Sequence, residues 1–286
     1  MENFKQFYKE KLLKLKQAKT VKNTEIFIGK CKTVNKNLRN LLIIAALWVF
    51  AYDFILVHIP AWRPIWATIG LLARNVSFAF ITGFIFFFVN THLSSHKTKV
   101  KTYQYTANKI TALNALSSSL MKSINKKLGL PPEEDPETEE EFKKLCKKIN
   151  APTPVKYMVM ADSLTFQNWY VLFNFLDMET SKIVKDLLLI RDSLDSETLR
   201  LVTSIENKVN MFINMGKGNP IGPDDSLEFF AEYIFKYRGM CKELTAHLNT
   251  EYKPYADEYH HLENKKTRER REQKAQQQSQ QQEIQS

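Results

Sequence analysis

A few charged and amide side chains interrupt a long apolar stretch of this 286-residue chain. The three that lie deepest within it are Asp53, Arg74 and Asn75. Charged side chains near the centre of a lipid bilayer are rare, and they usually pair with one another or line a polar path. These three residues are therefore the first candidates for a functional site.

Asp53 and Arg74 would lie at similar depth if the apolar stretch formed two antiparallel helices joined near residue 62. Their offset would be about 4.5 Å at a rise of about 1.5 Å per residue, which an arginine side chain can span. A bidentate ion pair is one possible arrangement. In a second, Arg74 snorkels and Asp53 lies shallow enough to meet water or to be protonated. In a third, the pair forms between protomers, or these two residues and Asn75 line an ion path.

Two further groups of side chains have the chemistry to bind a metal ion or a proton. His92 and His96 share a helical face at an i, i+4 spacing but lack a third ligand, so we expect no metal site there. A histidine close to a membrane can also respond to pH, although this signal is not specific. The densest group of possible ligands adjoins a polar tail, so we expect it to form a solvated charged face. Its members are Asp257, Glu258, His260, His261 and Glu263.

The sequence contains none of the catalytic motifs considered. The segment GKGNP at 216–220 lacks the GxxxxGK[ST] pattern of a phosphate loop, and no GxSxG or HExxH motif is present. Cys31, Cys146 and Cys241 are widely spaced and odd in number. We expect free thiols in a reducing compartment, and neither catalytic residues nor a metal or other cofactor.

Two apolar runs, at 41–59 and 65–89, are each long enough to cross a hydrocarbon core of about 30 Å. The prolines of PAWRP at 60–64 separate them. Neither run shows the polar face of a soluble helix, and the first begins too far along the chain for a signal peptide. Ala79 and Gly83 form a small-x3-small match that would permit close helix contact. The sequence therefore predicts an all-α membrane protein with a transmembrane hairpin at 41–90.

The formal net charge of +10 is distributed unevenly around this hairpin. Basic residues flank it closely, whereas 128–264 is acidic, a distribution that disfavours nucleic-acid binding. The positive-inside rule predicts that both termini lie in the cytosol, with the basic flanks at an anionic leaflet. Trp62 and Trp66 would lie at the opposite interface, where aromatic belts occur. The flanking cations are Lys30, Lys32, Lys36, Arg39, Lys97, Lys99 and Lys101.

The segments that border the hairpin are predicted to be helical and cytosolic. Residues 1–40 form a basic amphipathic helix, which either lies on anionic lipid or packs on the cytosolic domain. Residues 91–128 continue the second span as a helical stalk that can pair with that helix as a coiled coil, and 129–137 form a linker. The chain ends in a polar, Gln-rich tail at 265–286, either disordered or a frayed helix.

The largest cytosolic segment, 138–264, is predicted to be an acidic helical bundle without strands. Capping boxes at Thr138 and Asp225 mark two of its helix starts. Its aromatic side chains are expected to form a core. The other predicted helices are 155–176, 178–193 and 196–215.

This organisation favours a two-pass membrane protein that holds an acidic interaction domain at the cytosolic membrane face. We expect a non-enzymatic scaffold or sensor that binds a protein partner through 138–264 and can self-associate. One alternative is an oligomeric pore or ion-path subunit that uses Asp53, Arg74 and Asn75. A second is a membrane-tethered enzyme, whose site would have to come from the cluster at 257–263.

Overall fold

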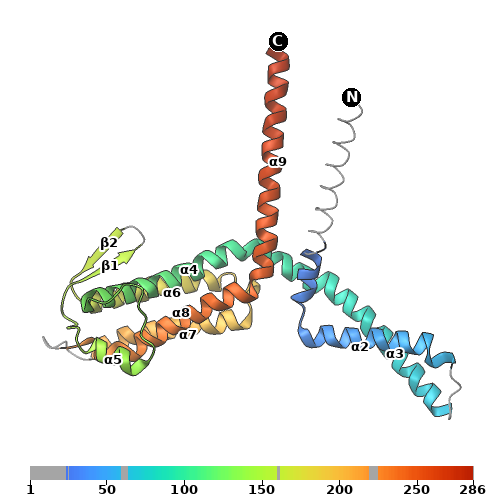
Figure 1. Ribbon diagram of the computed structural model, residues 1–286, viewed down its shortest axis with the longest axis horizontal. Coiled ribbons are helices and arrows are strands. Elements are labelled where there is room, and N and C mark those ends of the chain that lie inside the picture. Colours follow the sequence, from blue (N-terminus) through green and yellow to red (C-terminus); the bar gives the residue numbers. More distant parts are fainter. Residues whose placement is uncertain (1–23, 25, 59–63, 160–161, 219–224, 286) are drawn as a thin grey trace. The chain divides into compact units, whose positions relative to one another are not determined.

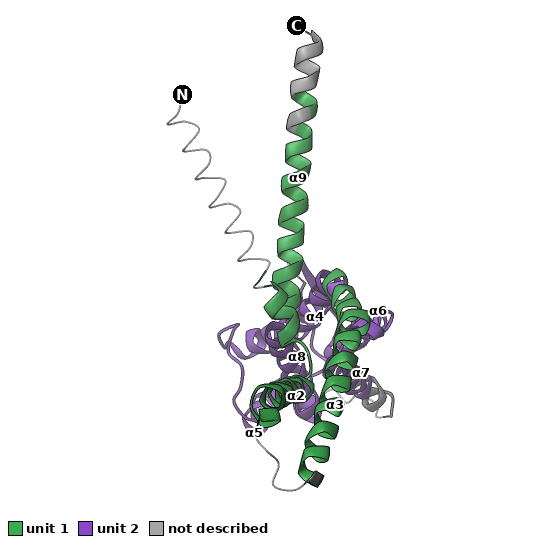
Figure 2. Cartoon of the chain, turned by 90° about the vertical axis from the view of Figure 1, so that its right-hand side faces the viewer, with its two compact units in different colours: residues 1–101, 254–286 green, residues 102–253 purple. Residues whose placement is uncertain are grey.

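The computed structural model is almost entirely helical, with two short strands (Figure 1). It describes residues 24, 26–58, 64–159, 162–218 and 225–285. The predicted amphipathic helix at 1–40 lies largely outside these residues, as do Trp62 and Arg63. The described chain divides into two compact units, one of residues 1–101 and 254–286 and the other of residues 102–253 (Figure 2).

The first unit contains a helical hairpin of α2 (Lys36–Phe54) and α3 (Pro64–Phe87), with a short 3-10 turn, η1 (Leu56–His58), after α2. Asn35 caps α2 by accepting a hydrogen bond from the backbone N–H of Asn37. Pro64 occupies the first position of α3, where its fixed φ suits a helix and its missing N–H is not needed. The two helices pack against each other (Figure 1).

Both hairpin helices are long and apolar enough to cross a membrane. Their outer side chains remain uncovered by the described residues: Ile44 is 62% exposed, Leu47 63% and Phe86 71%. The apolar helices of a soluble hairpin would instead be buried in a core. The prediction of two apolar helices of membrane-spanning length is therefore confirmed, although the helices begin and end a few residues from the predicted bounds.

A single helical path continues from α3 toward the second unit. A π-helical turn, η2 (Phe88–His92), joins α3 to α4 (Leu93–Leu128), the predicted stalk. Such a turn widens the helix by one residue per turn and shifts the direction of the following side chains. The predicted tail is also helical: α9 (Lys253–Gln285) extends through most of it.

The second unit buries its core between the later part of α4 and four further helices. These are α5 (Glu139–Cys146), α6 (Trp169–Leu188), α7 (Ser196–Gly218) and α8 (Ala231–Glu251), with short 3-10 turns η3 (Arg191–Ser193) and η4 (Leu227–Phe230). The aromatic residues expected in the core are there, since Tyr157, Trp169 and Phe173 are buried. Other large, fully buried side chains are Phe142, Tyr237, Ile110, Leu113, Leu120, Ile124, Leu172 and Leu176. Part of the predicted stalk is thus a core helix of this unit.

The prediction that this domain has no strands is wrong. Residues 155–166, predicted as the start of a helix, form β1 (Val155–Val159) and β2 (Asp162–Phe166), which pair antiparallel. In β1, Val155 and Tyr157 are buried while Lys156 and Met158 are exposed, the two-residue alternation of a half-buried strand. Asn168 then caps α6 by accepting a hydrogen bond from Val171 N–H, and α6 runs without the break expected near residue 177.

The predicted linker at 129–137 is held closely against its neighbours. Gly129 ends α4 with a φ of 71°, a left-handed conformation that glycine adopts at little cost. The amide of Asn125 donates hydrogen bonds to the carbonyls of Pro131 and Glu134. Thr138 caps α5 by accepting from Glu141 N–H, as predicted. The expected cap at Asp225 is instead Ser226, which accepts from Glu228 N–H.

Candidate functional site

The hairpin contains a bidentate ion pair between its two helices. The Arg74 Nε donates to Asp53 Oδ1 at 2.5 Å, and its Nη2 donates to Asp53 Oδ2 at 3.2 Å. The guanidinium also lies over the Phe78 ring, 4.9 Å from its centroid, and 6.0 Å from that of Tyr52. Of the three arrangements considered from the sequence, the single chain forms the first. The planar guanidinium suits a carboxylate in this geometry, which a lysine could not reproduce.

The fit between the helices explains why the pair can form. A Cβ added at Gly70 would lie 2.8 Å from the Tyr52 ring, so only glycine allows α3 to approach Tyr52 this closely. One helical turn later, Arg74 lies on the same face of α3 as Gly70. Asn75, one position further on, is exposed, and its side-chain amide has no hydrogen-bond partner among the described residues. The structure thus joins Asp53 to Arg74 but does not bring Asn75 to them.

A second group of polar side chains joins three distant segments of the first unit, and we call it the Glu258 cluster: Lys30, Thr33, His92, His96 and Glu258. Glu258, in α9, lies between a cation and an imidazole: its Oε1 is 2.8 Å from Lys30 Nζ, and its Oε2 is 2.8 Å from His96 Nε2. His96 is 2% exposed, and the Glu258 side chain is 12% exposed. This carboxylate therefore makes charge-assisted contacts in a largely dry environment.

Thr33 and His92 complete the cluster. Thr33 Oγ1 donates to the Lys30 carbonyl at 2.8 Å. His92 Nε2 lies 3.0 Å from the same carbonyl and 3.1 Å from Thr33 Oγ1, while His96 Nδ1 lies 3.4 Å from Thr33 Oγ1. With a proton on Nε2 of each imidazole, His92 donates to the Lys30 carbonyl and His96 donates to Glu258.

The surroundings of His96 favour its neutral form. Tyr255 packs its ring against the imidazole with centroids 4.8 Å apart, and Lys99 lies over that ring at 5.5 Å. Burial lowers the pKa of His96 from its ordinary value, and the hydrogen bond to Glu258 opposes this shift only in part. Nearby Lys30 and His92 also lower it. His96 thus acts as a neutral hydrogen-bond donor to a charged carboxylate.

The expectation that 257–263 forms a solvated charged face is wrong for Glu258, because folding places Lys30 and His96 against it. Sequence reasoning identified the shared face of His92 and His96 but missed their partners. Asp257, His261 and Gly29, together with Glu258 itself, line a hollow of about 350 Å³. Among the residues that the structure describes, no group of three or more His, Cys, Asp or Glu side chains is arranged to hold a metal ion.

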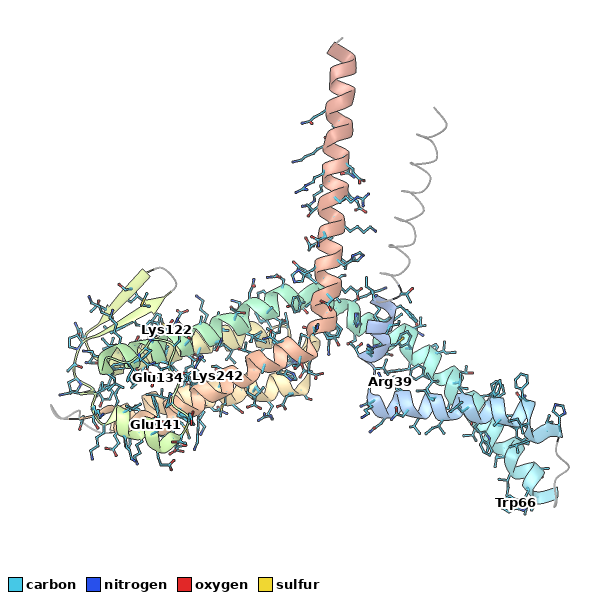
Figure 3. The ribbon with its side chains drawn as sticks, in the orientation of Figure 1. Arg39, Trp66, Lys122, Glu134, Glu141 and Lys242 are labelled. Atoms are coloured by element: carbon cyan, nitrogen blue, oxygen red, sulfur yellow. The ribbon has the colours of Figure 1, made fainter. Side chains whose placement is uncertain are left out.

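Some of the predicted membrane-interface residues make contacts within the first unit, whereas others are exposed. Lys30 pairs with Glu258, and Lys99 lies over Tyr255. Trp66 is 63% exposed near the beginning of α3, whereas Arg39 lies near the beginning of α2, at the opposite end of the hairpin (Figure 3). The exposed cations on the side of Arg39 are Lys32, Lys36, Lys97 and Lys101.

The second unit has its own buried polar network, centred on Asp195 before α7. Its carboxylate accepts from Thr198 N–H at 2.9 Å, from Thr198 Oγ1 at 2.8 Å and from His247 Nε2 at 3.0 Å. Burial raises the pKa of Asp195, but hydrogen bonds from Thr198, Tyr252 and His247 outweigh it and lower the pKa to about 2. This geometry caps α7 and ties it to α8, which is a structural role.

An ion-pair network on the same unit fixes the linker. Arg238 in α8 donates to Asp135 in the linker and to Asn114 and Ser117 in α4. Lys242 lies 2.5 Å from the same Asp135 carboxylate. Figure 3 shows Lys242 in the same part of the unit as Lys122 and Glu134.

Comparisons with protein-family models, with curated proteins and with solved structures give no match to this chain.

Proposed function

We propose that this chain is a two-pass membrane protein whose α2 and α3 cross a lipid bilayer together. The observation that carries the proposal is the combination of exposed apolar side chains on both helices with the Asp53–Arg74 ion pair between them. Each unpaired charge at mid-bilayer would cost about 3 kcal/mol on the insertion scale. Pairing the two charges lowers that cost, which supports a role for the hairpin in lipid.

The proposed orientation places both ends of the chain in the cytosol. The segments that enter and leave the hairpin carry four exposed cations: Lys32, Lys36, Lys97 and Lys101. The connecting residues 59–63 contain a single basic residue, Arg63. Lysine and arginine are retained on the cytosolic side of membranes and attract anionic lipid there. In this orientation Trp66 lies at the far interface.

The helical domain of residues 102–253 is then held at the cytosolic membrane face, where we propose that it binds a protein partner as a scaffold or sensor. Leu189, which is 82% exposed, and Met178, which is 59% exposed, leave apolar surface on this domain for contact with another protein. Its buried polar networks, around Asp195 and Arg238, cap helices and fix the linker. The pore alternative receives less support, because Asp53 and Arg74 bind each other and Asn75 does not join them.

Membrane insertion and topology can be tested together on the full chain. We expect the protein to stay in the membrane pellet after alkaline carbonate extraction. In a cysteine-free background, Ala61→Cys and Ser196→Cys should react with a membrane-impermeant maleimide from opposite faces of sealed vesicles. Release by carbonate, or labelling of both positions from one face, would contradict the proposal.

Ion flux separates the anchor from the pore. Liposomes that contain the wild-type protein should hold a potassium gradient as well as empty liposomes do. A leak that disappears when Asp53 and Arg74 are both replaced by Leu would favour the pore instead.

A further inference from the structure

Helix α3 has two faces, and α2 covers only one of them. Gly70, Arg74 and Ser77 are partly covered on the side of α2, whereas Asn75, at the next position after Arg74, is exposed. Asn75, Ala79 and Gly83 recur every four residues, so they share one face of the helix. Ala79 and Gly83 are exposed as well.

Packing within the hairpin accounts for only one of the two glycines of α3. Gly70 allows close contact with Tyr52 inside the hairpin. A Cβ added at Gly83 would meet nothing within 4 Å, so packing within the described chain does not require a glycine there. Glycine also weakens a helix interior by about 1 kcal/mol relative to alanine. A close approach by something outside the chain would account for Gly83.

The side chain of Asn75 also indicates that something outside the chain contacts this face of α3. In the described residues its amide has no hydrogen-bond partner, although it lies near the middle of an apolar helix. An amide left unpaired in hydrocarbon is costly, because no water is available to replace the missing bonds. A carboxamide both donates and accepts, so one asparagine can satisfy another.

We propose that the face of α3 around Asn75 binds the same face of a second copy of this chain, with the two Asn75 amides hydrogen-bonded across a two-fold axis along the membrane normal. This inference rests on the proposed function, since it requires α3 to lie in lipid. Two copies that insert with the same topology hold Asn75 at the same depth, and a two-fold axis brings each residue opposite itself. Ala79 and Gly83, one and two turns further along, allow the two backbones to approach closely.

The self-complementarity of the amide argues for a second copy over an unrelated helix. Another protein would have to present a matching polar group at the same depth, whereas a second copy does so by symmetry. Asn75 sits beside the Asp53–Arg74 pair but on another side of α3, so the dimer leaves that pair inside each hairpin. The association therefore needs no change in the fold of either copy.

The test is energy transfer between full-length copies labelled with donor or acceptor dyes beyond Ser286, reconstituted in liposomes over a range of protein-to-lipid ratios. Wild-type protein should show transfer that falls on dilution with lipid. Asn75→Leu should weaken the association about tenfold, the range expected for an interhelical amide bond. Gly83→Leu should weaken it at least as much by holding the backbones apart.

Asn90→Leu is the matched control. Asn90 is also exposed, but its amide donates to the Phe86 carbonyl within its own helix, so its replacement should leave association unchanged. Circular dichroism of each variant checks that the helices are intact.

Carbonate extraction and flotation of the same liposomes separate this inference from the proposed function. Protein that does not insert contradicts the proposed function. Inserted protein that shows no transfer overturns the inference alone, as does inserted Asn75→Leu that associates like wild type.

Discussion

The carboxylate of Glu258 lies 2.8 Å from Nε2 of the buried His96, although 162 positions separate the two residues. This contact, with the Lys30–Glu258 ion pair, attaches the beginning of α9 to the segment before the hairpin and to the beginning of α4. The segment before the hairpin and the beginning of α4 leave the apolar helices on the side that we propose to be cytosolic, and their contacts hold the beginning of α9 there. The cluster thus couples the basic flank of the hairpin to a long polar helix.

The first prediction concerns pH. The folded-state pKa of His96 is below its ordinary value because the imidazole is buried. When the cluster opens, His96 regains its ordinary pKa near 6.5 and binds a proton more readily. Neutral His96 therefore stabilises the folded cluster fully above about pH 6.5. This stabilisation is lost as the pH falls from there toward the folded-state pKa. Hydrogen exchange of residues 253–262 should therefore accelerate as the pH is lowered from 7.5 to 5.5, after correction for intrinsic exchange rates.

Two variants control this pH experiment. His96→Gln should abolish the pH-dependent opening, because glutamine can donate to Glu258 but does not titrate in this range. His260→Gln, which changes an exposed histidine of α9, should leave the pH-dependent opening in place. An unchanged pH profile in His96→Gln would exclude His96 as the titrating group.

The second prediction tests the charge on Glu258. Glu258→Gln keeps the shape of the side chain but leaves Lys30 without a carboxylate partner, so the unfolding free energy should fall by about 1–3 kcal/mol. Glu263→Gln is the control, since Glu263 pairs with Lys266 on the exposed side of α9 and solvent screens such a pair, so it adds little to stability. Denaturant titration in detergent measures both. Equal effects of the two substitutions would show that the Glu258 contacts add no stability.

The third prediction concerns the cap of α7. Asp195→Ala removes the acceptor of Thr198 and His247, so it should destabilise the second unit by about 1–2 kcal/mol. The folded-state pKa of Asp195, about 2, is below its unfolded value. Its contribution is therefore present above about pH 4 and disappears as the pH falls toward 2.

Thermal unfolding at pH 7 and at pH 2.5 measures the effect of this cap. The difference between wild type and Asp195→Ala should shrink at the lower pH. Asp192→Ala, which changes a nearly fully exposed carboxylate, should have almost no effect at either pH. A constant difference between wild type and Asp195→Ala would mean that the carboxylate charge is irrelevant to the cap.

The sequence predicted the hairpin because the signals for it are local. Apolar runs of sufficient length with prolines between them require two helices, and a short connection makes the helices antiparallel. The depths of Asp53 and Arg74 could then be compared by counting residues. Thr138 was identified as a cap for the same reason, since a capping box involves only four consecutive residues.

Features that depend on contacts between distant segments were missed. Nothing near Glu258 indicates Lys30 or His96 as partners, because only tertiary packing brings residues 30, 96 and 258 together. The β1–β2 hairpin was missed because Met160 and Ala161, between the strands, do not have the Asn-Gly or Gly-rich sequence of a recognisable turn. The strands are also short, so alternation of buried and exposed residues extends over only five positions each.

The last two predictions concern the Asp53–Arg74 pair, and the first compares the loss of one charge with the loss of both. Asp53→Leu should reduce membrane insertion and stability, because Arg74 would then carry an unpaired charge that costs about 3 kcal/mol in lipid. Arg74→Leu should act in the same direction, since it strands the carboxylate. The double Leu variant should be at least as stable as either single variant, because replacing both members of a buried pair with apolar residues is often neutral or stabilising. Glycosylation-based insertion assays and unfolding in mixed micelles measure the two effects.

Charge reversal tests whether Asp53 and Arg74 interact directly. Asp53→Arg and Arg74→Asp should each impair insertion, and the combination should recover most of the loss because the opposite charges again face each other between α2 and α3. Recovery in the reversed pair but not in either single variant requires contact between the two positions, since independent effects would add. If the reversed pair is as impaired as the sum of the single variants, the two side chains act separately, and Arg74 then reaches the headgroups by itself.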